Sequence, residues 1–139
     1  MNKKKLIEEL KRHEGLRLKP YKCTAGKLTI GIGRNIEDIG ITEAEAEQML
    51  LNDISRVEDD LDRNVMYWRD FPESVQRALV NFVFNVGITR ALRFKRMFKA
   101  LQNLDYHTAA DELLDSLYAK QVGRRAIEVA EMIREGASE

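Results

Sequence analysis

The chain has 139 residues, of which 44% are hydrophobic, and its 23 basic residues balance 23 acidic ones. The hydrophobic fraction is enough for a packed core and excludes a disordered chain, and the length is typical of one domain. A net charge of zero argues against a nucleic-acid-binding protein, and a single cysteine excludes an internal disulfide.

The N-terminal segment predicts an amphipathic helix that ends at Glu14. Leu6, Ile7 and Leu10 form its apolar stripe, and Gly15 follows as a C-cap signal. Charged residues interrupt this segment throughout, so we expect neither a signal peptide nor a transmembrane helix. Glu14 would lie at the negative end of the helix dipole, which disfavours a charged carboxylate. This position favours the protonated carboxyl that a general acid needs.

A β-hairpin is predicted to follow, with its turn at residues 24–27. Residues 28–33 alternate between aliphatic side chains and small ones, which are Thr29, Gly31 and Gly33. Period two therefore places a hydroxyl and two bare glycines on one face of the second strand. That face either lets the ring of a ligand approach the backbone, or the glycines only form bulges in a small hairpin.

The stretch over residues 13–34 contains Glu14, Cys23 and Thr29, which are separated by eight and then five residues. The stretch resembles the catalytic segment of the phage-type lysozymes, the endolysin muramidases of tailed phages. Members often have Asp where Cys23 stands, and usually His where Arg34 stands. Glycoside hydrolysis needs a proton for the leaving oxygen and a group that stabilises the oxocarbenium-like centre or aims a water. The resemblance implies that Glu14 supplies the proton and that Cys23 and Thr29 serve the second task.

Two roles for Cys23 stay open. Nearby Lys19, Lys22 or Arg17 could lower the pKa of the thiol, so that Cys23 acts as a thiolate. Alternatively, a neutral thiol lines the site while Thr29 orients the water.

A long helix is predicted from residue 42 to about residue 63, after a short connection over residues 35–41. Thr42 and Glu45 form a capping-box pattern at its start, and a single apolar stripe follows. One stripe on an otherwise charged helix is typical of a helix that bridges two lobes.

Four further helices are predicted after residue 63. Asp70 and Glu73 indicate a second capping box, with Pro72 in the first turn of an almost wholly apolar, central helix that ends at Gly87. The other three are expected near residues 89–102, 106–119 and 124–134, and the last four residues are expected to fray.

Together with the resemblance, these elements imply an α+β, mostly helical, lysozyme-like fold in one domain, residues 1–139. A small β-hairpin lobe would cover residues 14–41, and the bridging helix residues 42–63. The helical lobe would consist of residues 64–139 together with the N-terminal helix.

The candidate substrate-binding residues are Asn35, Phe84, Met97, Glu112 and Tyr118. The resemblance places aromatic side chains in the substrate cleft, although the local pattern favours core positions for Phe84 and Tyr118. Met97 stands where relatives place a polar contact.

Three supporting residues are also implied by the resemblance. Arg125 would reach Glu14 across the cleft, and Arg34 would form a salt bridge with Asp53 on the long helix. The two histidines share no ligand spacing, so no metal site is expected, and no cofactor is expected either.

Two functional classes remain. The first is an endolysin that hydrolyses the β-1,4 bond between N-acetylmuramic acid and N-acetylglucosamine in bacterial peptidoglycan. We expect it to be a monomer without a membrane anchor, held in the host cytoplasm, and the resemblance implies that a separate holin pore releases it to the cell wall. The second is a catalytically impaired peptidoglycan-binding or regulatory protein that keeps the fold, which the missing Asp at Cys23 would explain.

Overall fold

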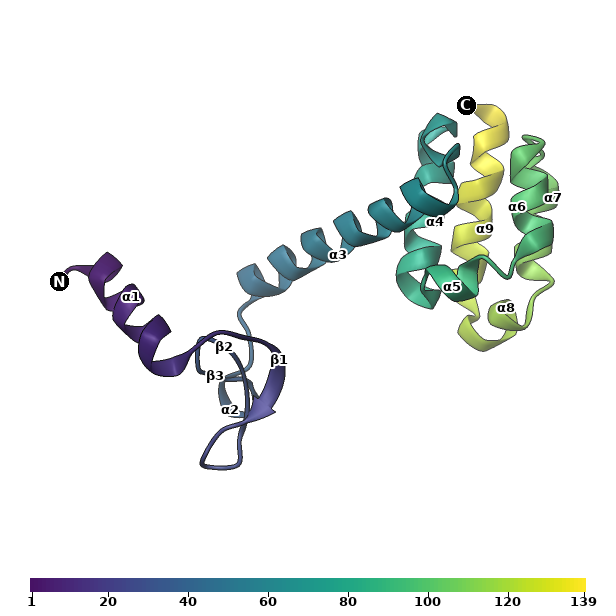
Figure 1. Ribbon diagram of the computed structural model, residues 1–139. Coiled ribbons are helices and arrows are strands. Elements are labelled where there is room, and N and C mark those ends of the chain that lie inside the picture. Colours follow the sequence, from purple (N-terminus) through teal and green to yellow (C-terminus); the bar gives the residue numbers. More distant parts are fainter. The chain divides into compact units, whose positions relative to one another are not determined.

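The computed structural model describes all 139 residues and divides them into two compact units, residues 1–48 and 49–139. Figure 1 shows the helices of both units and the short strands of the first, and the prediction of a mostly helical α+β chain is confirmed. The division falls within the long helix α3, Glu43–Asn64, whose 22 residues match the predicted bridging helix.

The first unit begins with helix α1, Lys3–Glu14, which ends where the sequence predicts. The side chain of Asn2 accepts a hydrogen bond from the N–H of Lys5 at the first turn, and the N–H of Gly15 bonds to the carbonyl of Lys11 at the last. No residue of α1 is buried. Glu14 therefore occupies the final helical turn, next to the sheet segment of the chain.

A three-stranded antiparallel sheet follows, in the order β1-β2-β3, with strands Arg17–Lys22, Leu28–Gly31 and Arg34–Asn35. The register of β1 against β2 shifts between Arg17 and Tyr21, a segment that includes Pro20, which has no N–H to donate. The second strand is shorter than predicted, because it ends at Gly31 and residues 32–33 turn the chain into β3.

The connection over residues 35–41 contains a short helix that the sequence analysis missed, α2, Ile36–Ile39. Asn35 accepts from the N–H of Asp38 at 3.0 Å and caps this helix, and Gly40 ends it. The next helix, α3, begins with the predicted capping box. The N–H of Glu45 donates to the Thr42 hydroxyl at 3.1 Å, and the N–H of Thr42 donates to Glu45 Oε1 at 2.9 Å.

The second unit contains six more α-helices and two single-turn 3₁₀ helices. In chain order they are η1 Trp68–Asp70, α4 Glu73–Val86, α5 Ile88–Ala91, α6 Lys95–Gln102, α7 Tyr106–Leu114, α8 Leu117–Val122, α9 Arg124–Glu135 and η2 Gly136–Ser138. The helices predicted near 89–102 and 106–119 are each broken in two. None of the helices in the chain combines the length and the apolar character needed to cross a membrane.

The second capping-box prediction is wrong. Helix α4 begins at Glu73, and Pro72 at its N-cap position has no side chain that could cap the first turn. The N–H of Ser74 in this turn donates to Glu139 Oε2 at 3.4 Å, from the end of the chain. Asp70 instead closes the 3₁₀ helix, two residues too early to reach the free N–H groups of α4.

Helix α4 is the apolar centre of the second unit, as predicted. It packs against α9, which in turn packs against α7, and α6 lies against α7 (Figure 1). Of the four C-terminal residues predicted to fray, Gly136 is buried and the other three are exposed, so the prediction is wrong for Gly136. A Cβ at Gly136 would lie only 2.4 Å from a methyl group of Val75, so the chain passes too close to α4 for a side chain.

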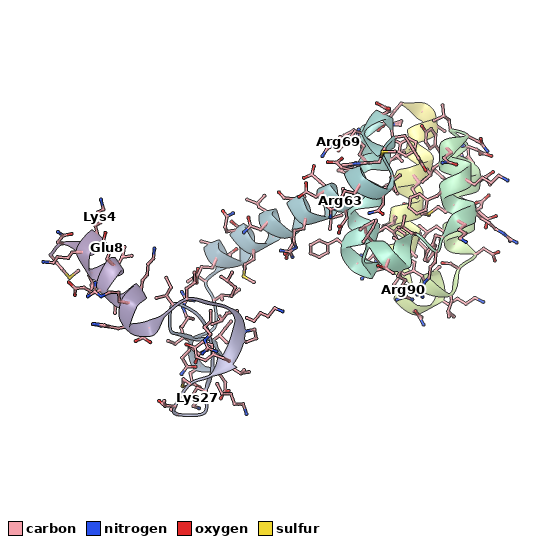
Figure 2. All side chains as sticks on the ribbon, viewed as in Figure 1. Lys4, Glu8, Lys27, Arg63, Arg69 and Arg90 are labelled. Atoms are coloured by element: carbon pink, nitrogen blue, oxygen red, sulfur yellow. The ribbon has the colours of Figure 1, made fainter.

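The single tryptophan anchors the end of α3 to this unit. The Trp68 indole N–H donates to Asp62 at 2.8 Å, and the guanidinium of Arg69 lies 4.6 Å from the centroid of the Trp68 ring. Arg69, labelled in Figure 2, also pairs with Asp62 at 2.8 Å. Trp68 is only 2% exposed and belongs to the hydrophobic core of the unit.

Candidate active site

The carboxyl group of Glu14 lies against the backbone of Gly33, in the turn between β2 and β3. A Cβ atom placed at Gly33 would lie 2.6 Å from Glu14 Oε2 and 2.9 Å from its Cδ. The end of α1 and the β2–β3 turn therefore meet at this carboxyl, which remains exposed. The sequence analysis predicted a glycine face on the second strand, but not that Glu14 occupies part of it.

Cys23 starts the tight turn between β1 and β2. The N–H of Gly26 donates to the Cys23 carbonyl at 2.8 Å, and the N–H of Cys23 donates to the Lys27 carbonyl at 3.0 Å. Lys27, labelled in Figure 2, lies at the far end of this turn. The thiol is partly exposed.

The pKa of the Cys23 thiol is lowered from its ordinary value by the turn itself. The backbone N–H of Lys27 contributes most, followed by that of Ala25 and, more weakly, by the Thr29 hydroxyl, while partial desolvation opposes them. The cause is thus hydrogen bonding from the backbone, rather than the basic side chains suggested by the sequence. Because these N–H groups stabilise negative charge on a side chain at this position, a carboxylate could accept the same bonds.

Thr29 lies beneath this turn, on β2 opposite Tyr21, and only 3% of its surface is exposed. Its hydroxyl lies 2.9 Å from the Lys27 carbonyl and is also a hydrogen-bond partner of the Cys23 sulfur. A hydroxyl has one proton, so it can donate to only one of these acceptors at a time. Cys23 and Thr29 are therefore neighbours in the fold, and their shared role stays a prediction.

The expected salt bridge between Arg34 and Asp53 is wrong. The guanidinium of Arg34 instead forms a two-pronged pair with Glu45, at 2.9 Å from Nη1 and 2.6 Å from Nη2. Asp53 lies eight residues further along α3, about 12 Å away at 1.5 Å per residue, and pairs with Arg56. The predicted partner of Arg34 was thus on the correct helix, α3, but in the wrong turn of that helix.

Glu45 thus serves two purposes, as the capping residue of α3 and as the partner of Arg34. The Arg34 guanidinium, followed by the N–H of Thr42, lowers the pKa of Glu45 to about 2. Arg34 also donates to the Gly40 carbonyl at 3.0 Å. Through its ion pair with Glu45 and its hydrogen bond to Gly40, Arg34 therefore joins β3 to the first turn of α3 and to the end of α2.

Two of the predicted substrate-binding residues are buried. Tyr118 is 2% exposed and Met97 is 1% exposed, although Met97 borders a cavity of about 430 Å³. The Tyr118 ring packs edge-to-face on Phe82 and Phe94, with centroid distances of 5.3 and 6.1 Å. Both residues belong to the core of the second unit.

Phe84, by contrast, is 43% exposed and lines a cavity of about 560 Å³ within the second unit. Arg125 borders the same cavity, and its Nε donates to the side-chain oxygen of Asn81 at 3.1 Å. Asn81 therefore ties α4 to α9.

The remaining two candidates have separate surroundings. Both polar side-chain atoms of Asn35 bond to Asp38, so this residue acts as a helix cap. Glu112 is partly exposed and borders a cavity of about 430 Å³ together with Arg93 and Ser116.

Comparison with known proteins finds similarity to lysozymes and endolysins. The family profile described as phage lysozyme matches residues 11–131. The chain is 37% identical over 120 residues to an endolysin of Acyrthosiphon pisum secondary endosymbiont phage 1, a match that covers 84% of this chain and 80% of that protein. It is 34% identical over 110 residues to a SAR-endolysin of Bacteriophage PS119, covering 76% and 64% of the two chains. It is also 28% identical over 156 residues to a probable T4-type lysozyme of Dictyostelium discoideum, covering 91% and 92%.

Proposed function

The chain belongs to the phage lysozyme family, and we propose that it cleaves the β-1,4 bond between N-acetylmuramic acid and N-acetylglucosamine. As a member of this family it is a lysozyme-type glycoside hydrolase, and its substrate is peptidoglycan. The observation that carries the proposed mechanism is a thiol of lowered pKa, in contact with Thr29, within the same compact unit as the exposed carboxyl of Glu14.

Glu14 acts as the general acid. Its carboxyl gives a proton to the glycosidic oxygen as the bond from that oxygen to C1 of the sugar breaks, and C1 gains oxocarbenium character. Two features support this assignment. The side chain is exposed to an incoming chain of sugars, and it lies in the last turn of α1, with its carboxyl against the backbone of Gly33.

Cys23 acts in its thiolate form on the water that attacks C1. The oxygen of the water bonds to C1 while its proton passes to the sulfur, so the step leaves a Glu14 carboxylate and a neutral thiol, and solvent restores both. The N–H groups of Lys27 and Ala25 support this role because they stabilise the thiolate. Thr29 is almost fully buried, which favours a role in holding the sulfur over direct contact with the sugar.

The biological setting is proposed from the relatives. The endolysin names of two phage relatives support action on the wall of the host cell at the end of a phage cycle. In this proposal the protein acts as a monomer and reaches the wall through a separate holin pore.

Clearance of purified peptidoglycan by the Glu14→Gln variant tests the assignment. This change keeps the shape of the side chain and removes the proton, so the rate should fall by at least about 100-fold. Glu8→Gln, an exposed change on the same helix, should leave the rate unaltered. Borohydride reduction of the products should label muramic acid residues, because cleavage of the proposed bond exposes their reducing ends.

The same assay separates the alternative function. A wild-type protein that sediments with peptidoglycan without clearing it would be the impaired binding protein, and the proposed chemistry would be wrong. Near-normal clearance by Glu14→Gln would leave the hydrolase in place and remove Glu14 as its acid.

A further inference from the structure

Gly33 is the residue of the β2–β3 turn against which the Glu14 side chain lies. A Cβ at this position would meet three atoms of Glu14, at 2.6 Å from Oε2, 2.9 Å from Cδ and 3.0 Å from Cγ. The three heavy atoms nearest to that Cβ position therefore all belong to one side chain. The space that a methyl group would fill at residue 33 is therefore occupied by the proposed catalytic carboxyl.

A side chain at Gly33 would displace this carboxyl without disturbing the core. The atoms in the way belong to the far end of an exposed, flexible side chain, which can rotate to another position at little cost in stability. General acid catalysis is far less tolerant, because a displacement of about 1 Å can reduce a rate by about 100-fold. Stability and activity should therefore respond very differently to the same methyl group.

We propose that Gly33 is a positioning residue for Glu14, in that the bare backbone of the β2–β3 turn forms the surface on which the carboxyl is held. This inference rests on the proposed function, since it assumes that Glu14 is the acid. It gives one of the two glycines of the predicted glycine face a specific task, namely to hold the enzyme's own carboxyl.

Gly31 provides a matched control, two residues away in the same segment. Its φ of +74° is almost the same as the +73° of Gly33, so an alanine at either position adopts the same unfavourable left-handed conformation. Nothing lies within 4 Å of a Cβ at Gly31, however. The two alanine variants therefore share the backbone strain and differ in the contact with Glu14.

The experiment compares wild type, Gly33→Ala, Gly31→Ala and Glu14→Gln. The kcat and KM for purified peptidoglycan are measured across pH, and Tm is measured by calorimetry. We expect similar losses of Tm in the two alanine variants and a kcat 10 to 100 times lower in Gly33→Ala than in Gly31→Ala, with KM changed less than threefold. One limb of the curve of kcat against pH should be lost in Glu14→Gln. The same limb should shift in Gly33→Ala and stay in place in Gly31→Ala.

Equal kcat values and equal pH limbs in the two alanine variants would overturn the inference while leaving Glu14 as the acid. Wild-type activity in Glu14→Gln would instead overturn the proposed mechanism on which it rests. If Gly33→Ala does not fold, the double variant Glu14→Ala/Gly33→Ala decides, because trimming the acid removes the contact. A folded double variant would support the inference, and an unfolded one would contradict it.

Discussion

The two compact units of this chain are ordered by different forces. In residues 1–48 the only buried side chain is that of Thr29, whereas every buried hydrophobic residue lies between Val57 and Ile133. The second unit is thus stabilised mainly by removing apolar surface from water, an effect that is strong and has little directionality. The first unit depends on caps, a tight turn and the ion pairs of Lys27 and Arg34, which are individually weak and strongly directional.

This difference fits the proposed function, in which the catalytic acid and the thiol both lie in the first unit. An acid and a thiol that act on one sugar bond need fixed geometry more than they need global stability. The first unit supplies that geometry through contacts such as those between Cys23, Thr29 and Lys27. Changes in the first unit should therefore alter activity at nearly constant stability, and changes in the second should do the reverse.

The largest effect is expected in the apolar core. Phe82→Ala removes a ring that is 1% exposed and packs on Phe94 at 4.9 Å, so the free energy of unfolding should fall by about 3–5 kcal/mol. Phe84→Ala, two residues away on the same helix and exposed, should cost less than about 1 kcal/mol. Urea unfolding followed by circular dichroism measures both. Equal losses would mean that the burial difference does not control stability.

Cys23 offers the opposite case, a large loss of activity at constant stability. Cys23→Ala should lower the rate of peptidoglycan clearance by at least about tenfold, because the group that accepts the proton is lost. Cys23→Asp should stay active, because the N–H groups of Lys27 and Ala25 can stabilise a carboxylate in the same way. Unimpaired clearance by Cys23→Ala would show that Glu14 and Thr29 suffice.

The lowered pKa of Cys23 can be measured directly. Alkylation by iodoacetamide should reach its half-maximal rate at a pH below the ordinary value for a thiol, and the bulky adduct should block lysis. Thr29→Val removes one donor to the sulfur, so the midpoint should move upward, though only slightly, because the backbone donors remain. An ordinary midpoint in the wild type would remove the argument for a thiolate.

The smallest effect is expected at Glu45, whose folded-state pKa is lowered to about 2 from 4.5. A lowered carboxyl pKa stabilises the folded state above the unfolded-state value, and this contribution is lost as the pH falls from about 4.5 to 2. Amide hydrogen exchange at β3, α2 and the start of α3 should therefore speed up in that range. Glu45→Gln should remove this pH dependence, and if exchange in the variant still follows pH in the same way, another group is responsible.

The sequence predicted most of the fold wherever a local signal was sufficient. The end of α1 at Gly15, the Thr42 and Glu45 capping box and the central helix that ends at Gly87 all follow from short-range patterns, and all are present. Asp70 shows the limit of such patterns, since the same spacing of residues occurs beside a 3₁₀ turn that the pattern does not reveal. Helix α2 could have been predicted from the sequence, because Asn35 is an N-cap signal and Gly40 is a C-cap signal one helical turn later.

The site was less predictable, because its contacts depend on tertiary geometry. Arg34 has several acids within sequence reach, and only the fold brings Glu45 to its guanidinium. Burial separates Tyr118 from Phe84, although both are aromatic residues in apolar helices. The contact between Gly33 and Glu14 joins residues that are 19 positions apart, and no local pattern reports it.

The chain has a single tryptophan and a single cysteine, and they fall in different units. Trp68 is buried in η1 of the second unit, so its intrinsic fluorescence should report the melting of that unit. A small fluorophore attached to Cys23 would report the first unit from the turn between β1 and β2. Wild-type protein therefore carries two separate optical probes, and the two melting curves, recorded on one sample, would reveal whether α3 makes the units unfold together or lets them unfold one after the other.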